Sequence, residues 1–187
     1  MAQKRKDWNG LISGFKASDL VFLDESGCNT DMTRRYAYSL GGSRAVDSAP
    51  LSKPKNTTIL SSIQLDGTLR YTTFSGGTTV ERFKRYLETD LLPHLNGNSV
   101  LIMDNMKLHH AKAVRNLLDS SGVRYIYLPP YSPDLNPIEK LWSKVKSFLR
   151  KFKARTLDAL PNAIQNAFHS VTVSDCSGWF RFCGYAL

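Results

Sequence analysis

The chain has 187 residues, of which 42% are hydrophobic and 22% charged, so its composition is that of a globular protein and excludes a disordered chain. Lys and Arg number 25 against 16 Asp and Glu, and the formal charge of +9 favours a polyanionic partner such as nucleic acid, with solubility alone as the simpler explanation. Three cysteines without a CxxC pair argue against a disulfide framework and a zinc site of the usual spacing. No apolar run reaches the ~20 residues of a membrane span, and we therefore expect a reduced, cytoplasmic protein.

The first half of the chain predicts a strand, a long loop, a hairpin and a helix. Residues 19–26, DLVFLDES, form a short apolar run typical of a buried strand. A stretch rich in Arg and Lys follows from about residue 27 to 56, and loops of this length are usually functional or disordered. The segments TTILSSIQL and LRYTTFS flank Asp66-Gly67, which is a strong hairpin signal. Thr78 or Thr79 can then cap a segment whose apolar residues recur at helical spacing.

Strands and helices alternate in the second half of the chain. SVLIMDN is a short apolar strand, HHAKAVRNLLDSSG predicts a helix that ends at Gly122, and VRYIYLPP predicts a strand stopped by two prolines. Asn136-Pro137 opens a helix whose apolar stripe includes Trp142, and a last helix runs from about residue 156 to 171. A hairpin followed by βαβα units predicts an α/β fold, with a mixed sheet and helices on both faces.

Three acidic residues stand at positions where such a sheet holds ligands. Asp24 and Asp104 follow short apolar strands, and open α/β sheets bind ligands at the carboxyl ends of their strands. Each of them alone is explained as well by a cap or a turn. Glu139 is the third residue of the helix that Asn136 opens, which is the capping-box position and needs no chemistry. Together, however, Asp24, Asp104 and Glu139 form the minimum set of oxygen ligands for Mg²⁺ or Mn²⁺ in two-metal phosphodiester cleavage.

Several stretches of the chain resemble a known family. VFLDESG, LIMDN followed by HH, and LPPYSPDLNPIEKLWSKVK are similar to DDE transposases of bacterial insertion sequences in the mariner-type superfamily. The 34 residues between Asp104 and Glu139 match the spacing in that family. The resemblance covers about residues 19 to 185 and implies a ribonuclease-H-like fold with Asp24, Asp104 and Glu139 as catalytic and metal-binding triad. It also implies Mg²⁺ or Mn²⁺, with two ions expected, and endonucleolytic hydrolysis at transposon ends followed by strand transfer to target DNA.

The resemblance also predicts an organisation and partners for the chain. We expect a basic N-terminal lead-in at 1–18, the catalytic domain at 19–172 and an aromatic C-terminal tail at 173–187 that packs on the domain or on a partner chain. Double-stranded DNA is the implied partner, bound by a homodimer at least on DNA, in the nucleoid of the cytoplasm and not at a membrane. Only 23 residues precede Asp24, too few for the family's helix-turn-helix module. We therefore expect a separate or frameshift-fused module to recognise the transposon ends.

Basic residues outside the triad are candidates for DNA contacts. Those in the loop at 27–56 lie where related transposases reach a partner subunit, and a solvated surface loop is the equally good alternative. The histidines after Asp104 touch DNA phosphates or, more simply, pack at the start of a helix. The lysines after Glu139 add positive charge near the DNA path, and their spread around the helix also suits a solvated face. The candidates are Arg34, Arg35, Arg44, His109, His110, Lys140 and Lys144.

Two other functions stay open from the sequence. A ribonuclease-H-type or junction-resolving nuclease would use the same fold and needs a further carboxylate, which Glu81 or Glu88 could supply. A catalytically inactive DNA-binding transposase remnant is the other, although all three triad positions are acidic. Glu25 faces the opposite side of the strand from Asp24 by alternation, so it is not predicted to be a ligand. Trp142 is predicted to lie in the core, and Asp134 to form an Asx turn.

Overall fold

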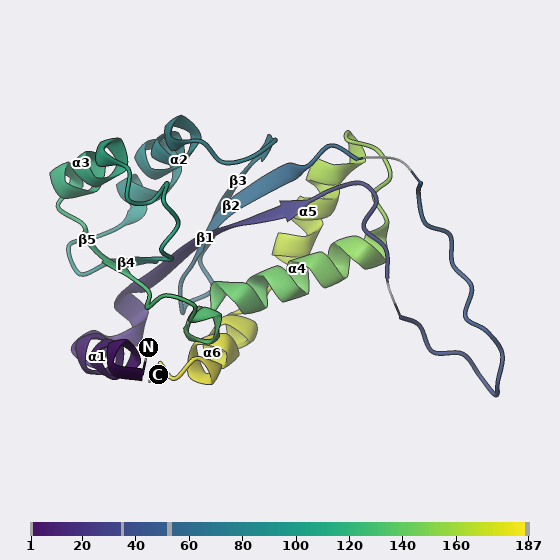
Figure 1. Ribbon diagram of the computed structural model, residues 1–187, viewed down its shortest axis with the longest axis horizontal. Coiled ribbons are helices and arrows are strands. Elements are labelled where there is room, and N and C mark those ends of the chain that lie inside the picture. Colours follow the sequence, from purple (N-terminus) through teal and green to yellow (C-terminus); the bar gives the residue numbers. More distant parts are fainter. Residues whose placement is uncertain (1, 35, 52–53, 186–187) are drawn as a thin grey trace.

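The computed structural model describes residues 2–34, 36–51 and 54–185 and is built on one mixed sheet (Figure 1). The strand order is β3-β2-β1-β4-β5, in which β1, β2 and β3 pair antiparallel and β1, β4 and β5 pair parallel. The strands are β1 (Leu20–Cys28), β2 (Thr57–Ile63), β3 (Leu69–Ser75), β4 (Val100–Met103) and β5 (Arg124–Tyr127). The helices are α1 (Ala2–Ile12), α2 (Val80–Tyr86), α3 (Lys112–Ser121), α4 (Ile138–Phe152), α5 (Ala159–His169) and α6 (Val173–Phe182).

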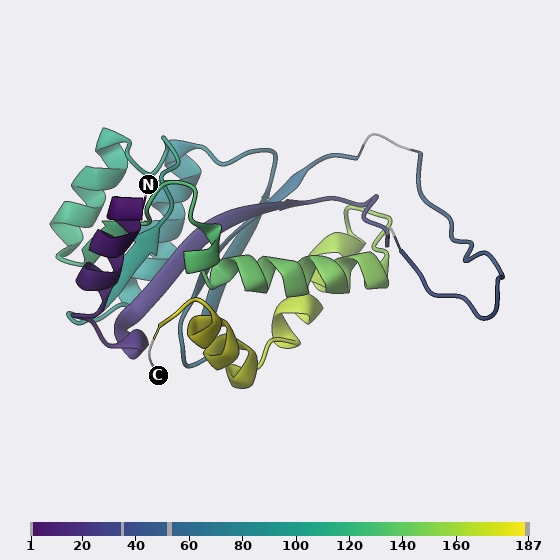
Figure 2. The ribbon, with the colours of Figure 1, turned by 60° about the horizontal axis from the view of Figure 1, so that its bottom comes forward.

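Helices cover both faces of the sheet because alternate strand residues point to opposite sides. Leu20 and Phe22 of β1 belong to a core cluster shared with α4, α5 and α6. Val21 and Leu23 belong to a second cluster shared with α2 and α3. The two layers of helices lie on opposite sides of β1 in Figures 1 and 2. The predicted α/β fold with a mixed sheet and helices on both faces is therefore confirmed.

The predicted hairpin turn, the cap at Thr79 and the helix end at Gly122 are also confirmed. At the hairpin Gly67 has φ +89°, and Thr68 N–H donates to Asp66 Oδ1 at 2.8 Å, so glycine supplies the left-handed backbone that the turn needs. Thr79 caps α2 by accepting from Arg82 N–H at 3.3 Å. Gly122 ends α3 with φ +70°.

Both ends of the described chain pack into the same core cluster. The segment predicted as a basic lead-in contains the helix α1, which the sequence did not predict, and its Trp8 is buried. The predicted aromatic tail forms α6 and packs on the domain, with Phe180 and Tyr185 buried against Phe22 of β1. In the described part of the chain, no helix is long and apolar enough to cross a membrane.

The long basic loop leaves the body of the molecule as an arm. Its described residues 36–51 contain neither helix nor strand and extend beyond the end of β1 in both views of the ribbon (Figures 1 and 2). Lys153 near the end of α4 forms an ion pair with Asp47 of the arm, 2.5 Å between Nζ and Oδ1. Arg155 donates to the carbonyl oxygens of Thr30 and Met32 at 3.1 and 3.2 Å. These contacts tie the arm to the helical layer that carries α4.

Candidate active site

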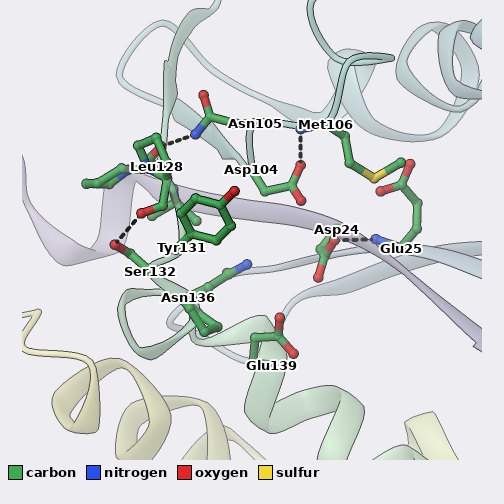
Figure 3. Close-up of a pocket in the computed structure, with 13 residues that line it drawn as sticks. Asp24, Glu25, Asp104, Asn105, Met106, Leu128, Tyr131, Ser132, Asn136 and Glu139 are labelled. Atoms are coloured by element: carbon green, nitrogen blue, oxygen red, sulfur yellow. Dashed lines mark hydrogen bonds between the residues drawn. The ribbon is translucent and has the colours of Figure 1, made fainter. Parts of the chain in front are cut away.

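The three predicted carboxylates line one pocket of about 600 Å³ at the rim of the sheet (Figure 3). Asp24 comes from β1, Asp104 directly follows β4, and Glu139 lies in the first turn of α4. Elements that are far apart in the sequence therefore bring these side chains to one place. The segment between β5 and α4 forms the other wall, with Tyr131 and Asn136 among the lining residues.

Asp24 lies inside β1, so the prediction that the strand ends there is wrong. Parallel pairing with β4 stops at Leu23 and Met103, whereas antiparallel pairing with β2 continues as far as Cys28. Asp24 faces the pocket because β4 does not cover this part of the edge of β1. The residue is nevertheless buried, with 8% of its surface accessible. Its Oδ2 accepts from Trp142 Nε1–H at 3.0 Å and its Oδ1 from Glu25 N–H at 2.8 Å. Burial raises the pKa of Asp24 to about 7 against the opposing effect of these two hydrogen bonds.

Asp104 is paired with a histidine that is completely buried. The distance from His109 Nδ1 to Asp104 Oδ1 is 2.8 Å, and Met106 N–H donates to the same oxygen at 2.9 Å. His109 Nε2 lies 3.4 Å from Glu25 Oε1. Burial by itself would lower the pKa of His109, but its hydrogen bonds with Asp104 and Glu25 and their charges outweigh burial and raise it to about 10. His109 is thus a buried cation between two carboxylates, and this position does not fit the predicted contact with DNA.

Glu25 takes part in the site even though it faces away from Asp24. Asp24 and Glu25 face opposite sides of β1, as predicted from alternation. Asp24 contacts Trp142 of α4, and Glu25 contacts His109. Glu25 nevertheless lines the same pocket because both residues stand where the β4 edge is open. Its Oε2 is buried and has no hydrogen-bond partner among the described residues.

Glu139 has no capping role in the structure. The prediction that Asn136 is the N-cap of α4 is wrong, because Pro137 occupies that position and no side chain caps the helix. Asn136 is instead buried, and its Oδ1 finds no hydrogen-bond partner in the described part of the chain. The Glu139 side chain is exposed and points toward Asp24 in Figure 3. Helix capping therefore does not explain why a glutamate stands at position 139.

The donor set suits a hard divalent cation. Among the described residues, no three His, Cys, Asp or Glu side chains are close enough together to hold a metal ion as they stand. Asp104 is turned toward His109 and Met106 N–H rather than toward the other two carboxylates. The pocket nonetheless gathers carboxylate oxygens and the unpartnered oxygens of Glu25 and Asn136. Oxygen ligands of this kind fit Mg²⁺ or Mn²⁺.

The other predicted contact residues lie outside the pocket, as far as the structure describes them. Arg34 and Arg44 are exposed on the loop, and Arg35 lies outside the described residues. His110 is exposed and its ring packs, tilted by 31°, against Tyr127 with 4.0 Å between ring centroids. Lys140 Nζ lies 3.8 Å from the Phe182 ring centroid, and Lys144 pairs with Asp175 at 2.5 Å. The carboxylates that a ribonuclease-H-type nuclease would need, Glu81 and Glu88, also line no part of this pocket.

Some residues of the site gave no sequence signal for their role. Trp142 is in the core as predicted, but its indole N–H also holds Asp24. Tyr131 is 85% exposed at the pocket wall and has φ +54°, a conformation that costs a non-glycine residue about 1 kcal/mol. Asp134 forms an ion pair with Arg5 in place of the predicted Asx turn. Only the unusual backbone of Tyr131 could have been suspected from the sequence, since the two prolines before it interrupt the strand.

Fold and site together define a ribonuclease-H-like domain with a carboxylate pocket at the rim of its sheet. The family model described as "DDE superfamily endonuclease" matches residues 19–161. The chain therefore belongs to the DDE superfamily endonucleases, and the matched range includes all three carboxylates.

Comparison with known proteins identifies relatives among transposases. The chain is 30% identical to the Tc1 transposase of Caenorhabditis elegans over 97 residues, which are 50% of this chain and 36% of that protein. The structure of the pre-cleavage Mos1 transpososome is similar with a TM-score of 0.82 at 18% identity, covering 97% of this chain and 58% of that chain. The catalytic domain of Mos1 mariner transposase is similar with a TM-score of 0.73 at 16% identity, covering 96% of this chain and 85% of that chain.

The identity and the coverage of these matches determine what each one shows. At such identities the Mos1 structures show the fold, which is the ribonuclease-H-like fold predicted from the sequence. The chain spans about a third of the length of the Tc1 transposase and just over half of the Mos1 chain in the transpososome. The chain is thus a DDE-type endonuclease domain that is similar in sequence to part of the Tc1 transposase and in fold to the Mos1 transposase.

Proposed function

We propose that this chain catalyses DNA transposition, hydrolysing phosphodiester bonds at transposon ends and joining the freed 3′-hydroxyl to target DNA. The observation that carries the proposal is the convergence of Asp24, Asp104 and Glu139 on one pocket in a domain of the DDE family. Relatives with this fold were solved as a transpososome and a strand transfer complex of Mos1. The resemblance of the LPPYSPDLNPIEKLWSKVK segment supports an origin in a bacterial insertion sequence.

Asp24, Asp104 and Glu139 would hold the divalent metal, Mg²⁺ or Mn²⁺, with two ions expected. Structures of the mariner Mos1 paired-end complex were solved with Mn and with Mg. Bound ions of this kind activate the attacking oxygen and stabilise the leaving oxygen in phosphodiester cleavage. The chain's own groups orient the ligands: Trp142 Nε1–H and Glu25 N–H fix the Asp24 carboxylate. The His109 cation holds Asp104 at the pocket wall and offsets the charge of Glu25.

The arm would join two copies of the chain on DNA. Its apolar side chains are between 88 and 105% exposed, which is unusual for side chains of this size unless a partner covers them. The residues are Tyr36, Tyr38, Leu40, Val46 and Leu51. A second copy of the chain is the partner that fits best, because a transposase must hold two transposon ends. Arg34 and Arg44 would then contact DNA beside this interface, and a helix-turn-helix module, separate or frameshift-fused, would recognise the end sequence.

Cleavage of a supercoiled plasmid carrying the element's two ends tests the proposal. We expect nicking with Mg²⁺ or Mn²⁺, no nicking with EDTA, and loss of nicking in Asp104→Ala with DNA binding retained. Glu81→Gln is the matched control, because it removes an acidic charge from an exposed position outside the pocket. Nicking that survives EDTA or Asp104→Ala would contradict the proposed site. DNA binding without nicking, even with the recognition module fused to the chain, would identify an inactive remnant.

A further inference from the structure

One face of α1 is docked on the body of the molecule. Arg5, Trp8 and Ile12 follow the i, i+3, i+7 spacing of one helix face and are at least partly buried, whereas Lys4 and Lys6 are exposed. Trp8 is only 3% accessible and belongs to the core cluster that also contains Leu20 of β1. The indole therefore fixes α1 beside the sheet, and Arg5 leaves the helix one turn earlier on the same face.

Arg5 reaches the segment that forms one wall of the active-site pocket. Its Nη1 lies 3.1 Å from Asp134 Oδ1 and 3.4 Å from Ser132 Oγ, and its Nη2 pairs with Asp134 Oδ2. Such a two-pronged contact between guanidinium and carboxylate constrains direction as well as distance. Asp134 stands in the 3-10 turn Pro133–Leu135, between β5 and α4. We call residues 131–136 the pocket loop.

The pocket loop needs support from outside itself. Tyr131 has a left-handed backbone conformation, and the Asn136 side-chain oxygen is buried without a partner in the described chain. The loop's own contacts therefore offset neither the backbone strain of Tyr131 nor the cost of burying the Asn136 oxygen. Two of its internal hydrogen bonds, Leu135 N–H to Ser132 O and Asn136 N–H to Pro133 O, form only the 3-10 turn. Support comes from both chain ends: Arg5 binds Asp134, and the Tyr185 hydroxyl donates to Leu135 O.

The pocket loop in turn sets the start of α4. Glu139 N–H donates to Asn136 O at 3.1 Å, so the last residue of the loop is bonded to the residue that carries the third carboxylate. Tyr131, Ser132, Pro133 and Asn136 also line the pocket itself. A shift of the loop therefore moves both the pocket wall and Glu139.

We infer that Arg5 is a positioning residue that acts through Asp134 on the pocket loop and Glu139. The ion pair is half exposed, with 40 and 53% of the two side chains accessible, and pairs of this kind add little to global stability. Its effect is on the geometry of the loop and not on whether the domain folds. The inference rests on the proposed function only for its effect on cleavage, because the loop's rigidity can be measured without activity.

Arg5→Ala, Arg5→Glu, Asp134→Arg and the charge-exchanged pair Arg5→Glu/Asp134→Arg test this inference. Lys6→Ala is the matched control, since it removes one positive charge from the same helix at a residue with no hydrogen bond or ion pair among those described. Hydrogen exchange of the amides at 131–139 should be faster in each single variant and return toward wild type in the exchanged pair. Amides of β2 should not change in any of them.

Cleavage of the end-bearing plasmid supplies the second readout. We expect Arg5→Ala to slow cleavage at saturating DNA about tenfold with unchanged DNA affinity, because misplacing a catalytic group by ~1 Å can cost about 100-fold in rate. The exchanged pair should recover most of the rate, and Lys6→Ala should keep the wild-type rate. Wild-type exchange at 131–139 in Arg5→Ala, or no recovery in the exchanged pair, would overturn the inference. If the wild type is inactive but hydrogen exchange at 131–139 changes in the variants as expected, only the proposed function is refuted.

Discussion

Asp24→Asn should make the metal-free protein more stable at neutral and alkaline pH. The carboxyl of Asp24 titrates near 3.8 when it is exposed and at about 7 in the folded protein. Between these values the folded state binds a proton that the unfolded state does not bind. This group's contribution to the free energy of unfolding therefore falls as the pH rises from about 4 to about 7, and it stays low above that.

The size of the effect follows from the shift. At 1.36 kcal/mol per pKa unit, ionised Asp24 costs the folded protein on the order of 4 kcal/mol. Asparagine resembles the neutral carboxyl: each offers only one full acceptor to the N–H groups of Trp142 and Glu25, so that loss is already contained in the pKa. In a domain of this length the gain corresponds to a rise in Tm of roughly 10 °C at about pH 8.

Thermal unfolding with EDTA and with Mn²⁺ measures the destabilisation by ionised Asp24 and the stabilisation by a metal ion bound to it. Mn²⁺ should raise the free energy of unfolding of the wild type by about 2.7 kcal/mol at 100 times the Kd, and its Tm with it, because the ion binds only the folded, ionised site. Asp24→Asn should start higher and gain nothing. Glu139→Gln is the control: its carboxylate is exposed, so it should lose the Mn²⁺ increment without the higher Tm in EDTA. The reasoning is refuted if Asp24→Asn is no more stable than wild type in EDTA, or if its gain is as large at about pH 4 as at about pH 8.

Four further expectations concern the thiols, two glycines and the arm. Burial raises the pKa of each of the three thiols to about 11, so all should resist a thiol reagent in the native protein near neutral pH and react once it is unfolded; rapid native labelling would contradict their burial. Gly67→Ala should cost about 1–2 kcal/mol by chemical denaturation, because φ is +89° and the new Cβ would lie 3.1 Å from Val173 Cγ2. Gly178→Ala, inside α6 with free space around it, should instead stabilise by up to about 1 kcal/mol. Tyr38→Asp with Leu40→Asp on the arm should abolish DNA-dependent dimers in light scattering with an unchanged Tm, and dimers that persist would place the interface elsewhere.

The features predicted correctly from the sequence are those that local physics determines. Asp66-Gly67 demands a left-handed turn whatever surrounds it, and Thr79 caps the residues that follow it directly. Alternation along β1 separates Asp24 from Glu25 without knowledge of any other strand. The meeting of Asp24 and Asp104 in one pocket also follows from a general rule, because ligands bind at the carboxyl edge of the parallel strands, which here is the place where the pairing of β1 with β4 ends.

The features that were missed depend on partners far away in the chain. β1 continues past Asp24 because β2 pairs with it, and nothing within the strand itself marks where β4 stops. α1 contains Asn9-Gly10, a poor helical pair, and is held by the burial of Trp8 against the sheet. His109 has two carboxylate partners, Asp104 and Glu25. Asp104 is near it in the sequence, but Glu25 lies 84 positions earlier and could not be inferred from local sequence.

Several energetic costs of this fold gather around the carboxylate pocket. A buried carboxylate with a pKa of about 7, a left-handed tyrosine and two buried oxygens without a partner in the described chain all line this pocket. A histidine with no exposed surface contacts two of the carboxylates that line it. Away from the pocket the two core clusters are mostly apolar, and the buried atoms without a partner in the described chain are Trp8 Nε1 and Asn29 Oδ1. Each cost at the pocket is removable by a single neutral or apolar substitution, so folding alone does not explain them, whereas a cation ligand site explains the oxygens that line the pocket. Strain that gathers around a triad of carboxylates therefore argues for a working catalytic site and against an inactive remnant.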